Sequence, residues 1–245
     1  YTEPVYTGWQ TIDGKVYYYT SNHQRVTGSQ VISGISYTFG SDGALQQGSG
    51  KNGIDVSSHQ GNIDWASVKA AGINFAIIRV GYRGSQTGAL VEDSCFKKNI
   101  QGATANGINV GVYFFTQATT EAEAVEEASM ALTLCSGYNL SYPIFVDTEN
   151  GSGAARANGL DKGTRTACVA AFCKTIANGG RKAGVYASKS WYNNKIDASA
   201  FSNYFIWVAQ YNTTCNYKGK YNMWQYSSKG SVPGIKGNVD VNIAY

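Results

Sequence analysis

Residues 142–150 read YPIFVDTEN, and this stretch decides how the rest of the chain is interpreted. The short apolar run 144–146 follows Pro143, a composition that predicts a buried strand opening after a turn. The run ends in two carboxylates, Asp147 and Glu149. Side chains at positions i and i+2 of a strand point to the same face, about 6–7 Å apart. Like charges held that close raise the pKa of one acid, which suits general acid–base chemistry, although an isolated Asp-x-Glu is more often an ordinary solvated strand end.

Similar apolar segments recur after residue 53 and alternate with helical signals. We predict eight strands, at 54–57, 75–80, 110–115, 144–147, 183–187, 205–209, 223–226 and 239–241. We predict helices at 64–71, 92–105, 120–135, 162–177 and, in shortened form, around 189–194. Strands that alternate with helices form parallel β/α units. The expected fold class is therefore α/β, with a short and irregular (β/α) barrel that is smaller than the usual ~250 residues.

Barrel enzymes carry their active sites at the C-terminal ends of the strands. The predicted strand ends bring together four carboxylates: Asp55, Asp147, Glu149 and Asp240. Other polar and aromatic side chains accompany them: His59, Arg79, Tyr113, Tyr186, Trp207, Gln210, Trp224 and Gln225. Acids at three separate strand ends are much less expected by chance than one Asp-x-Glu pair. The sequence therefore predicts an active site at this mouth, with aromatic rings placed to stack on sugars.

Five motifs between residues 53 and 245 resemble, in order, those of glycoside hydrolase family 25, the lysozyme-type muramidases. They are GIDVSSHQGNIDWASVKAAGINFAIIRVGYR, YPIFVDTEN, WVAQY, MWQYSS and GNVDVN. The resemblance implies hydrolysis of the β-1,4 bond between N-acetylmuramic acid and N-acetylglucosamine in peptidoglycan. It implies that Glu149 is the general acid and Asp147 the aspartate of the Asp-x-Glu motif. It also implies that Asp55 and Asp240 are the family's first and late aspartates.

The roles of the four acids follow in part from their surroundings. Glu149, facing an aromatic wall, should have a raised pKa and protonate the leaving oxygen. Asp147 is placed either to orient the substrate's own 2-acetamido group as the nucleophile or to activate a water molecule. Its closeness to Glu149 favours retention of configuration. We expect Asp55 and Asp240 to hold Asp147 or the sugar in subsite −1.

Other interpretations stay open at this point. His59 can be a turn residue, Arg79 can pair with an acid at the rim or simply be buried and neutralised, and the strand-end aromatics can belong to the core. A chitinase-like N-acetylglucosaminidase is an alternative function, because family 18 also ends a barrel strand in Asp-x-Glu. The longer Asp-x-x-Asp-x-Asp-x-Glu run of that family is missing. A catalytically silent wall-binding protein that kept the fold is another alternative, against which the four acids argue.

Residues 8–48 contain a repeat with a period of 20 residues. Each unit is predicted to be a β-hairpin, with turns at Asp13-Gly14 and Ser33-Gly34. The units resemble the aromatic repeats of choline-binding and glucan-binding wall modules, in which rings surround a quaternary ammonium group. Ser29 stands in the second unit where the first has Trp9, so the ring set is incomplete. We expect a hairpin module at 1–50, which either contacts teichoic acid or another wall polymer or serves as a structural spacer, and a catalytic domain at 51–245.

The composition sets limits on the partners. The net charge is only +4 and no basic run exceeds two residues, which argues against nucleic acid. No apolar run approaches the ~18–20 residues of a membrane span. The five Cys and two His lack the spacing of a zinc site, and no organic cofactor is implied. The first residues lack the pattern of a signal peptide, so we expect a processed form of a secreted or wall-associated monomer that binds peptidoglycan glycan strands.

Overall fold

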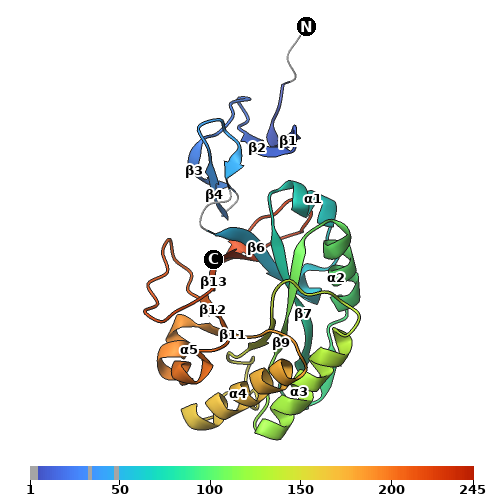
Figure 1. Ribbon diagram of the computed structural model, residues 1–245, viewed down its shortest axis with the longest axis vertical. Helices are drawn as coiled ribbons and strands as arrows, with labels where there is room; N and C mark the ends of the chain where they lie inside the picture. The colour runs from blue at the N-terminus through green and yellow to red at the C-terminus, as the bar shows by residue number, and fades with distance from the viewer. Residues whose placement is uncertain (1–4, 33–34, 47–49) are drawn as a thin grey trace.

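The computed structural model describes residues 5–32, 35–46 and 50–245, and Figure 1 shows a barrel with a group of small hairpins beside it. Within these residues eight strands close the barrel: β6 (Lys51–Val56), β7 (Phe75–Arg83), β9 (Asn109–Phe115), β10 (Ile144–Asp147), β11 (Ala183–Ser188), β12 (Phe205–Ala209), β13 (Met223–Gly230) and β14 (Val239–Ala244). The ring is complete because β6 pairs with both β14 and β7. The predicted strands and the irregular barrel are confirmed. A short strand that was not predicted, β8 (Leu90–Glu92), pairs with the end of β7 outside the ring.

One strand of the barrel runs against the others. From β6 round to β13 through β7, the neighbours are parallel, but β14 is antiparallel to both β13 and β6. The alternation of strands and helices had predicted parallel units throughout. The reason for the difference is the connection 231–238, which contains no helix and is shorter than the crossover that parallel strands need. Asp240 therefore reaches the mouth from the N-terminal end of its strand.

Helices cover the outside of the barrel wall (Figure 1). They are α1 (Trp65–Ala70), α2 (Phe96–Ala105), α3 (Glu121–Leu134), α4 (Lys162–Asn178) and α5 (Lys189–Asn194), with 3₁₀ turns η1 (Ser58–Gln60) and η2 (Ala198–Phe201). The predicted helix 92–105 begins later, at Phe96, because Glu92 belongs to β8. Asp64 and Thr120 cap α1 and α3 by accepting hydrogen bonds from backbone N–H groups of the first turn. Among the described residues, no helix is long and apolar enough to cross a membrane.

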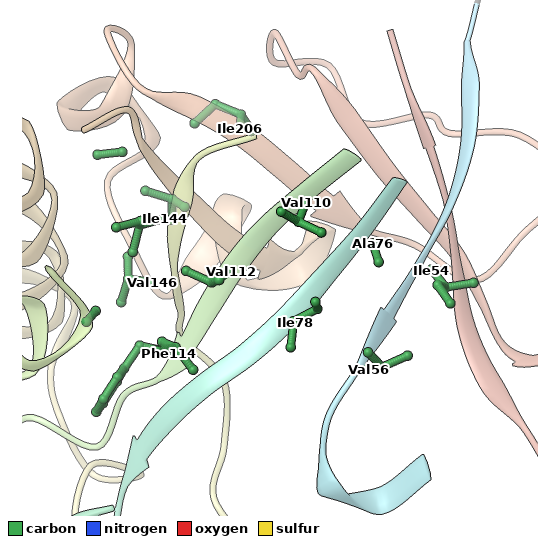
Figure 2. Packing of buried hydrophobic residues seen from close by; sticks show 14 of the residues in the cluster. Ile54, Val56, Ala76, Ile78, Val110, Val112, Phe114, Ile144, Val146 and Ile206 are labelled. Atoms are coloured by element: carbon green, nitrogen blue, oxygen red, sulfur yellow. The ribbon is translucent and has the colours of Figure 1, made fainter. Parts of the chain in front are cut away.

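The barrel wall has a buried side chain layer on each face. Figure 2 shows the layer under the helices, where Ile54 and Val56 alternate along β6 and Ile144 and Val146 along β10. The intervening residues face the interior, where Phe75, Phe145, Trp207 and Met223 pack together. Because strand side chains alternate with a period of two, Asp147 shares the inner face with Phe145. The sheet period thus places a carboxyl directly above the apolar floor of the barrel.

The hairpins are β1 (Gly8–Ile12) with β2 (Lys15–Tyr19), and β3 (Gly28–Ile32) with β4 (Ile35–Phe39) and β5 (Leu45–Gln46). Asp13 and Gly14 have φ values of 50° and 76°, as the predicted two-residue turn requires. The second predicted turn, Ser33-Gly34, lies outside the described residues.

The hairpins pack against the barrel through their aromatic rings. Tyr37 and Phe39 are 4% and 2% exposed, and the ring centroids of Trp9 and Tyr37 lie 4.7 Å apart. The Tyr37 hydroxyl donates a hydrogen bond to the backbone oxygen of Ala71 at the end of α1, at 3.4 Å. The rings that make the repeat recognisable are therefore used, at least in part, to attach the hairpins to the barrel.

Candidate active site

A cavity of 140 Å³ opens at the barrel end where β10 and β11 finish. Its lining consists of carboxyl, aromatic and amide side chains: Asp55, Tyr113, Asp147, Glu149, Tyr186, Trp207, Tyr211, Gln225 and Asp240. The structure thus brings together the four acids that the strand ends pointed to. Their catalytic roles stay predictions.

A larger cavity of 340 Å³ adjoins the first. The two cavities share Tyr113, Asp147 and Glu149, so they form one continuous cleft. The larger part extends over His59 and Arg79 and along the loop that follows Glu149. The two acids of the Asp-x-Glu motif therefore lie where the parts of the cleft meet.

Asp55 is held by two amide side chains. Its Oδ2 atom accepts hydrogen bonds from Gln225 Nε2 and Asn242 Nδ2, both at 2.8 Å. Asn242 in turn accepts a 2.8 Å hydrogen bond from Trp207 Nε1. Burial, followed by the nearby charge of Asp240, raises the pKa of Asp55 well above its ordinary value, although both amides act in the opposite direction. Asp55 is thus a carboxyl group held in one orientation by two amide donors.

Gln225 has its amide orientation fixed by two tyrosine hydroxyls. Its Oε1 atom accepts from Tyr186 at 2.8 Å and from Tyr211 at 3.0 Å. Because an amide oxygen only accepts and the NH₂ group only donates, this leaves the NH₂ group to face Asp55. A hydrogen-bonded chain therefore runs from the rim of the cavity, where Tyr211 is exposed, to the buried carboxyl.

Asp147 is 5% exposed, and its Oδ1 atom is buried without a hydrogen-bond partner among the described residues. Burial is the main cause that raises the pKa of Asp147 well above its ordinary value, followed by the charges of Glu149 and Asp55. Arg79 acts weakly in the other direction. An unpartnered carboxyl oxygen in such a place is costly to leave unsatisfied, so it is suited to receive an N–H or O–H donor from a bound molecule.

Glu149 is exposed, and it lines both parts of the cleft. Loss of water around the carboxyl raises the pKa of Glu149, and the charge of Asp240 raises it further. Burial also raises the pKa of Asp240 itself. A carboxyl that stays protonated to higher pH can serve as a proton donor. Among the described residues, no group of three or more His, Cys, Asp or Glu side chains is arranged to hold a metal ion.

His59 and Arg79 lie along the larger part of the cleft. His59 is exposed in η1, and its backbone N–H donates to Ser57 Oγ at 3.2 Å. Arg79 Nε donates to Asp93 Oδ2 at 2.7 Å, and its Nη2 donates to Ser58 Oγ at 3.0 Å. Arg79 is therefore mostly buried and neutralised by the buried Asp93, which agrees with the second of the two interpretations that the sequence left open.

Trp224 and Gln210 line neither part of the cleft. Adjacent residues on a strand face opposite sides, so Trp224 points to the outer layer when Gln225 points inward. Its indole N–H donates to the backbone oxygen of Gln210 at 2.9 Å, and its ring packs on Tyr226. The side chain of Gln210 is bonded at both ends to Asn216. The structure therefore gives these two residues packing and loop-closing contacts in place of the predicted site positions.

Sequence reasoning missed Asn242 and did not assign Tyr211 a binding role. Asn242 lies two residues after Asp240, so the same i and i+2 rule that linked Asp147 to Glu149 places both on one face. Trp207, which was predicted, is only 1% exposed and forms the floor of the small cavity, with Tyr113 and Tyr186 beside it.

The loop after Glu149 is braced by polar side chains. Asn158 Oδ1 accepts from the Gly151 N–H at 2.9 Å, and its Nδ2 donates to the backbone oxygens of Gly151 and Gly153 at 3.0 Å. The backbone N–H of Arg156 donates to Ser85 across the cleft wall at 3.0 Å. Its guanidinium group donates to Glu123 of α3 at 2.6 Å.

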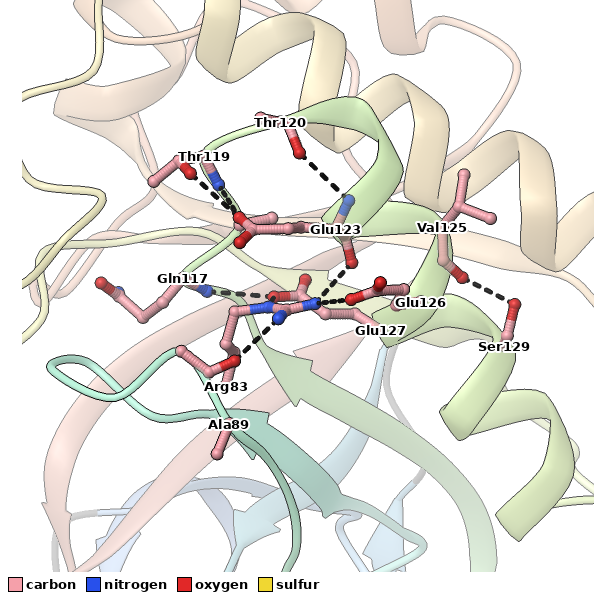
Figure 3. A network of polar contacts seen from close by, with 12 residues as sticks. Arg83, Ala89, Gln117, Thr119, Thr120, Glu123, Val125, Glu126, Glu127 and Ser129 are labelled. Atoms are coloured by element: carbon pink, nitrogen blue, oxygen red, sulfur yellow. Dashed lines mark hydrogen bonds and ion pairs between the residues drawn. The ribbon is translucent and has the colours of Figure 1, made fainter.

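Figure 3 shows the polar network beneath this loop, centred on Arg83 at the end of β7. Arg83 donates to the fully buried Glu127 at 2.8 Å and to Glu126 at 2.9 Å. Glu127 also accepts from the Thr116 hydroxyl just beyond β9. The ends of two barrel strands and the first half of α3 are thus tied together, which gives the larger cavity a rigid wall.

Comparison with known proteins gives consistent matches. The family model "Glycosyl hydrolases family 25" matches residues 54–235. Lysozyme M1 of Streptomyces globisporus is 30% identical over 204 residues, which cover 79% of this chain and 67% of that protein. Autolytic lysozyme of Clostridium acetobutylicum is 28% identical over 191 residues, covering 78% and 54%.

Among solved structures, the modular autolysin LytC from Streptococcus pneumoniae matches with a TM-score of 0.73 and 26% identity, over 98% of this chain and 67% of that one. A second structure of that autolysin is a complex with a synthetic peptidoglycan ligand. The chain therefore spans between about half and two thirds of the length of these three proteins.

Proposed function

The chain belongs to glycosyl hydrolases family 25 and is a glycoside hydrolase of the lysozyme type, and from this premise we propose that it cleaves the β-1,4 bond between N-acetylmuramic acid and N-acetylglucosamine in peptidoglycan. The observation that carries the proposal is the junction of the cleft, where exposed Glu149 and buried Asp147 meet. Glycoside hydrolysis needs two carboxyl groups beside the scissile bond. Glu149 and Asp147 would supply these two carboxyl groups from the tip of one strand.

Glu149 is the general acid in this proposal. A glycan strand that fills the cleft places one sugar in the small cavity and the next in the larger one. The oxygen that links them then lies near the carboxyl that both parts share. The raised pKa supports this role, because a protonated Glu149 can donate to the leaving oxygen as the bond breaks.

Asp147 assists from the buried side. Its unpartnered Oδ1 atom is an acceptor suited to the N–H of the substrate's 2-acetamido group. Holding that N–H would turn the acetamido oxygen toward the anomeric carbon, and the developing positive charge would be stabilised by the carboxylate. Asp55 and Asp240 flank this position, and we assign them the sugar in the small cavity. The expected outcome is retention of configuration.

We further propose that the protein is secreted or associated with the wall, and that residues 1–50 and 51–245 form its two modules. The aromatic contacts of Tyr37 and Phe39 support a hairpin module that rests firmly on the barrel. A chitinase-like activity and a silent wall-binding role have less support, since the family match is to family 25 and all four acids line the small cavity.

The direct test combines lysis of purified bacterial walls with identification of the new reducing ends. We expect muramic acid at the reducing end of the products, whereas a glucosaminidase leaves glucosamine there. Glu149→Gln should lose about 10²–10⁴-fold in activity because it removes the proton donor. Glu121→Gln, an exposed acid on α3, is the matched control. A folded Glu149→Gln variant that lyses walls as fast as this control would reject Glu149 as the acid.

A further inference from the structure

Positive charge is concentrated in the last third of the chain. Residues 160–245 contain eleven Lys and Arg but three Asp and no Glu, a net charge of +8, while the whole chain carries +4. The three acids are already engaged, because Asp161 and Asp197 cap helical turns and Asp240 lines the small cavity. This segment forms α4, α5 and the strands β11 to β14, coloured yellow to red in Figure 1. One side of the barrel is therefore strongly basic.

A groove of 410 Å³ lies within this basic segment. It is formed by the residues before β11, those between η2 and β12, and the end of the loop that leads to β13. Three cations line it, namely Arg181, Lys182 and Lys220. Its described lining contains no acid. The groove thus collects cations from separate parts of the fold without a compensating charge.

The three cations remain available to a ligand. Lys182 and Lys220 are exposed, and within the described part of the chain none of the three forms an ion pair. Arg181 is half-buried, and its Nη2 donates to the backbone oxygen of Cys135 at 3.1 Å. That bond fixes the guanidinium plane, and its other N–H groups have no hydrogen-bond partner among the residues that the structure describes. A fixed guanidinium fork next to two mobile ammonium groups is suited to bind phosphate oxygens.

The neutral side chains of the groove add donors. Asn222 accepts from the Ile206 N–H through its Oδ1 atom at 3.0 Å, so its NH₂ group is left to donate. Ser202 and Asn203 are exposed on the same lining. A groove with charged and neutral donors is better matched to an anionic acceptor chain than to a neutral sugar.

The hairpins offer much less to such a ligand, although a wall polymer was expected there. In their described part, Lys15 is paired with Asp42 at 3.1 Å. Arg25 lies over the Tyr17 ring, 5.4 Å from its centroid. Both cations already have partners, so an anionic polymer would have to compete for them.

The groove and the carboxyl cavity lie at opposite ends of the barrel. Ala183 and Phe205 in the groove are the first residues of β11 and β12, while Tyr186 in the cavity is three residues, or about 10 Å, further along β11. We propose that the groove binds a segment of a wall polymer that carries a phosphodiester in each repeat. The polymer then holds the enzyme on its insoluble substrate while the cleft stays open to glycan.

The test measures binding of the full chain to short-chain inorganic polyphosphate at physiological salt. The variant Arg181→Glu/Lys182→Glu/Lys220→Glu should bind at least about tenfold more weakly, because three direct charge contacts become repulsive. The control variant Lys195→Glu/Lys229→Glu/Lys236→Glu makes the same charge change at exposed positions of the same segment outside the groove. It should change affinity less than about threefold, because charges beyond about 8 Å are screened at this salt concentration.

Two further arms separate folding and chemistry from binding. Lys182→Glu/Lys220→Glu keeps the Arg181 bond to Cys135 and should still lose most of the affinity. Poly-L-glutamate should bind more weakly than polyphosphate, and hydrolysis of soluble muropeptide oligomers should be equal in all variants. Equal losses of polyphosphate binding in the groove and control triples would overturn the proposal in favour of diffuse charge. Equal binding of poly-L-glutamate would overturn the preference for phosphate. Neither result bears on whether Glu149 is the acid.

Discussion

Asp55 on β6 lies directly opposite Asp240 on β14 in the antiparallel register, and both carboxyl groups line the same small cavity. Two acids held face to face repel one another when ionised, and the surrounding protein must offset that repulsion. Asn242 and Gln225 do so from the side by donating to Asp55. The stability of this end of the barrel should therefore depend on the amide donors.

Asn242→Asp should destabilise the protein strongly at neutral pH. The change replaces an amide donor beside Asp55 by another carboxyl and keeps the acceptor for Trp207. Loss of a hydrogen bond to a charged group costs about 1.5–3 kcal/mol, and repulsion adds to it. The loss should shrink as the pH falls, because one carboxyl of the pair is then protonated. Urea unfolding at neutral and acid pH measures this loss of stability. The control is Asn222→Asp, which changes a half-buried amide far from the acids. A loss independent of pH would contradict the electrostatic cause.

Asp240→Asn should move the pH profile of catalysis. Burial is the first cause of the raised pKa of Glu149, and the charge of Asp240 is the second. Removing that charge lowers the pKa of Glu149, so the acid loses its proton at a lower pH. The basic limb of kcat/KM should shift to lower pH, measured with soluble muropeptide oligomers across the range. Asp42→Asn in the hairpins should leave the limb unchanged. A limb that stays in place in Asp240→Asn would show that another group sets it.

Arg156→Gln should loosen the wall of the larger cavity. Burial alone would raise the pKa of Glu123, but hydrogen bonds from Arg156 and Thr119 lower it to about 2. The folded state therefore gains stability above the unfolded pKa near 4.5, and this gain is lost as the pH falls toward 2. Partial exposure screens the pair, so we expect a loss of about 1 kcal/mol. The effect on kcat/KM for walls should exceed this loss of stability, because the Arg156 guanidinium also donates to the backbone oxygen of Gln117 at 3.4 Å and so helps to hold the loop beside the cleft.

The matched control for Arg156→Gln is Lys97→Gln, which breaks the exposed ion pair with Glu92 away from the cleft. Unfolding curves and kcat/KM should both be nearly unchanged in that variant. Arg156→Lys should recover part of the activity, since it keeps the charge but not the planar fork. Equal activity in Arg156→Gln and Lys97→Gln would show that the loop is positioned by Asn158 alone.

Tyr37→Ala should release the hairpins without harming catalysis. The ring is buried against the barrel, and its hydroxyl bonds to Ala71. Truncating a buried aromatic ring costs about 3–5 kcal/mol, enough to favour local opening of a small module. Limited proteolysis should cut before Lys51 faster than in the parent chain, while turnover of soluble oligomers stays equal. Tyr17→Ala, whose ring contacts Arg25, is the control. Unchanged proteolysis would mean that Phe39 and Trp9 hold the hairpins on their own.

The sequence was sufficient for the strands and for the meeting of Asp55, Asp147 and Glu149 at one mouth, because both depend on local patterns, whereas Asp240 reaches that mouth only because β14 runs the other way. Residues 142–150 contain the strand, its turn and its carboxylates in one stretch. The direction of β14 was not accessible from such a pattern, since it depends on the length of the connection that precedes it. The positions of Trp224 and Gln225 show the other limit. Adjacent residues on a strand cannot both face inward. A prediction that assigns every polar or aromatic residue at a strand end to the site ignores that alternation.

Hydrolysis should retain the configuration at the anomeric carbon. Asp147 and Glu149 are two residues apart on one strand tip, a spacing of about 6–7 Å that overlaps the range of inverting enzymes, so the expectation of retention rests on the surroundings of Asp147. The free Oδ1 atom of Asp147 is placed to accept the acetamido N–H, so the substrate's own oxygen can attack and form an oxazolinium intermediate. NMR of a defined oligosaccharide during hydrolysis should show the β anomer first, and Asp147→Asn should slow the reaction because it weakens that acceptor. Initial α product would rule out retention. Efficient hydrolysis of an analogue without the acetamido carbonyl, still with β product first, would keep retention but reject the substrate's own group as the nucleophile.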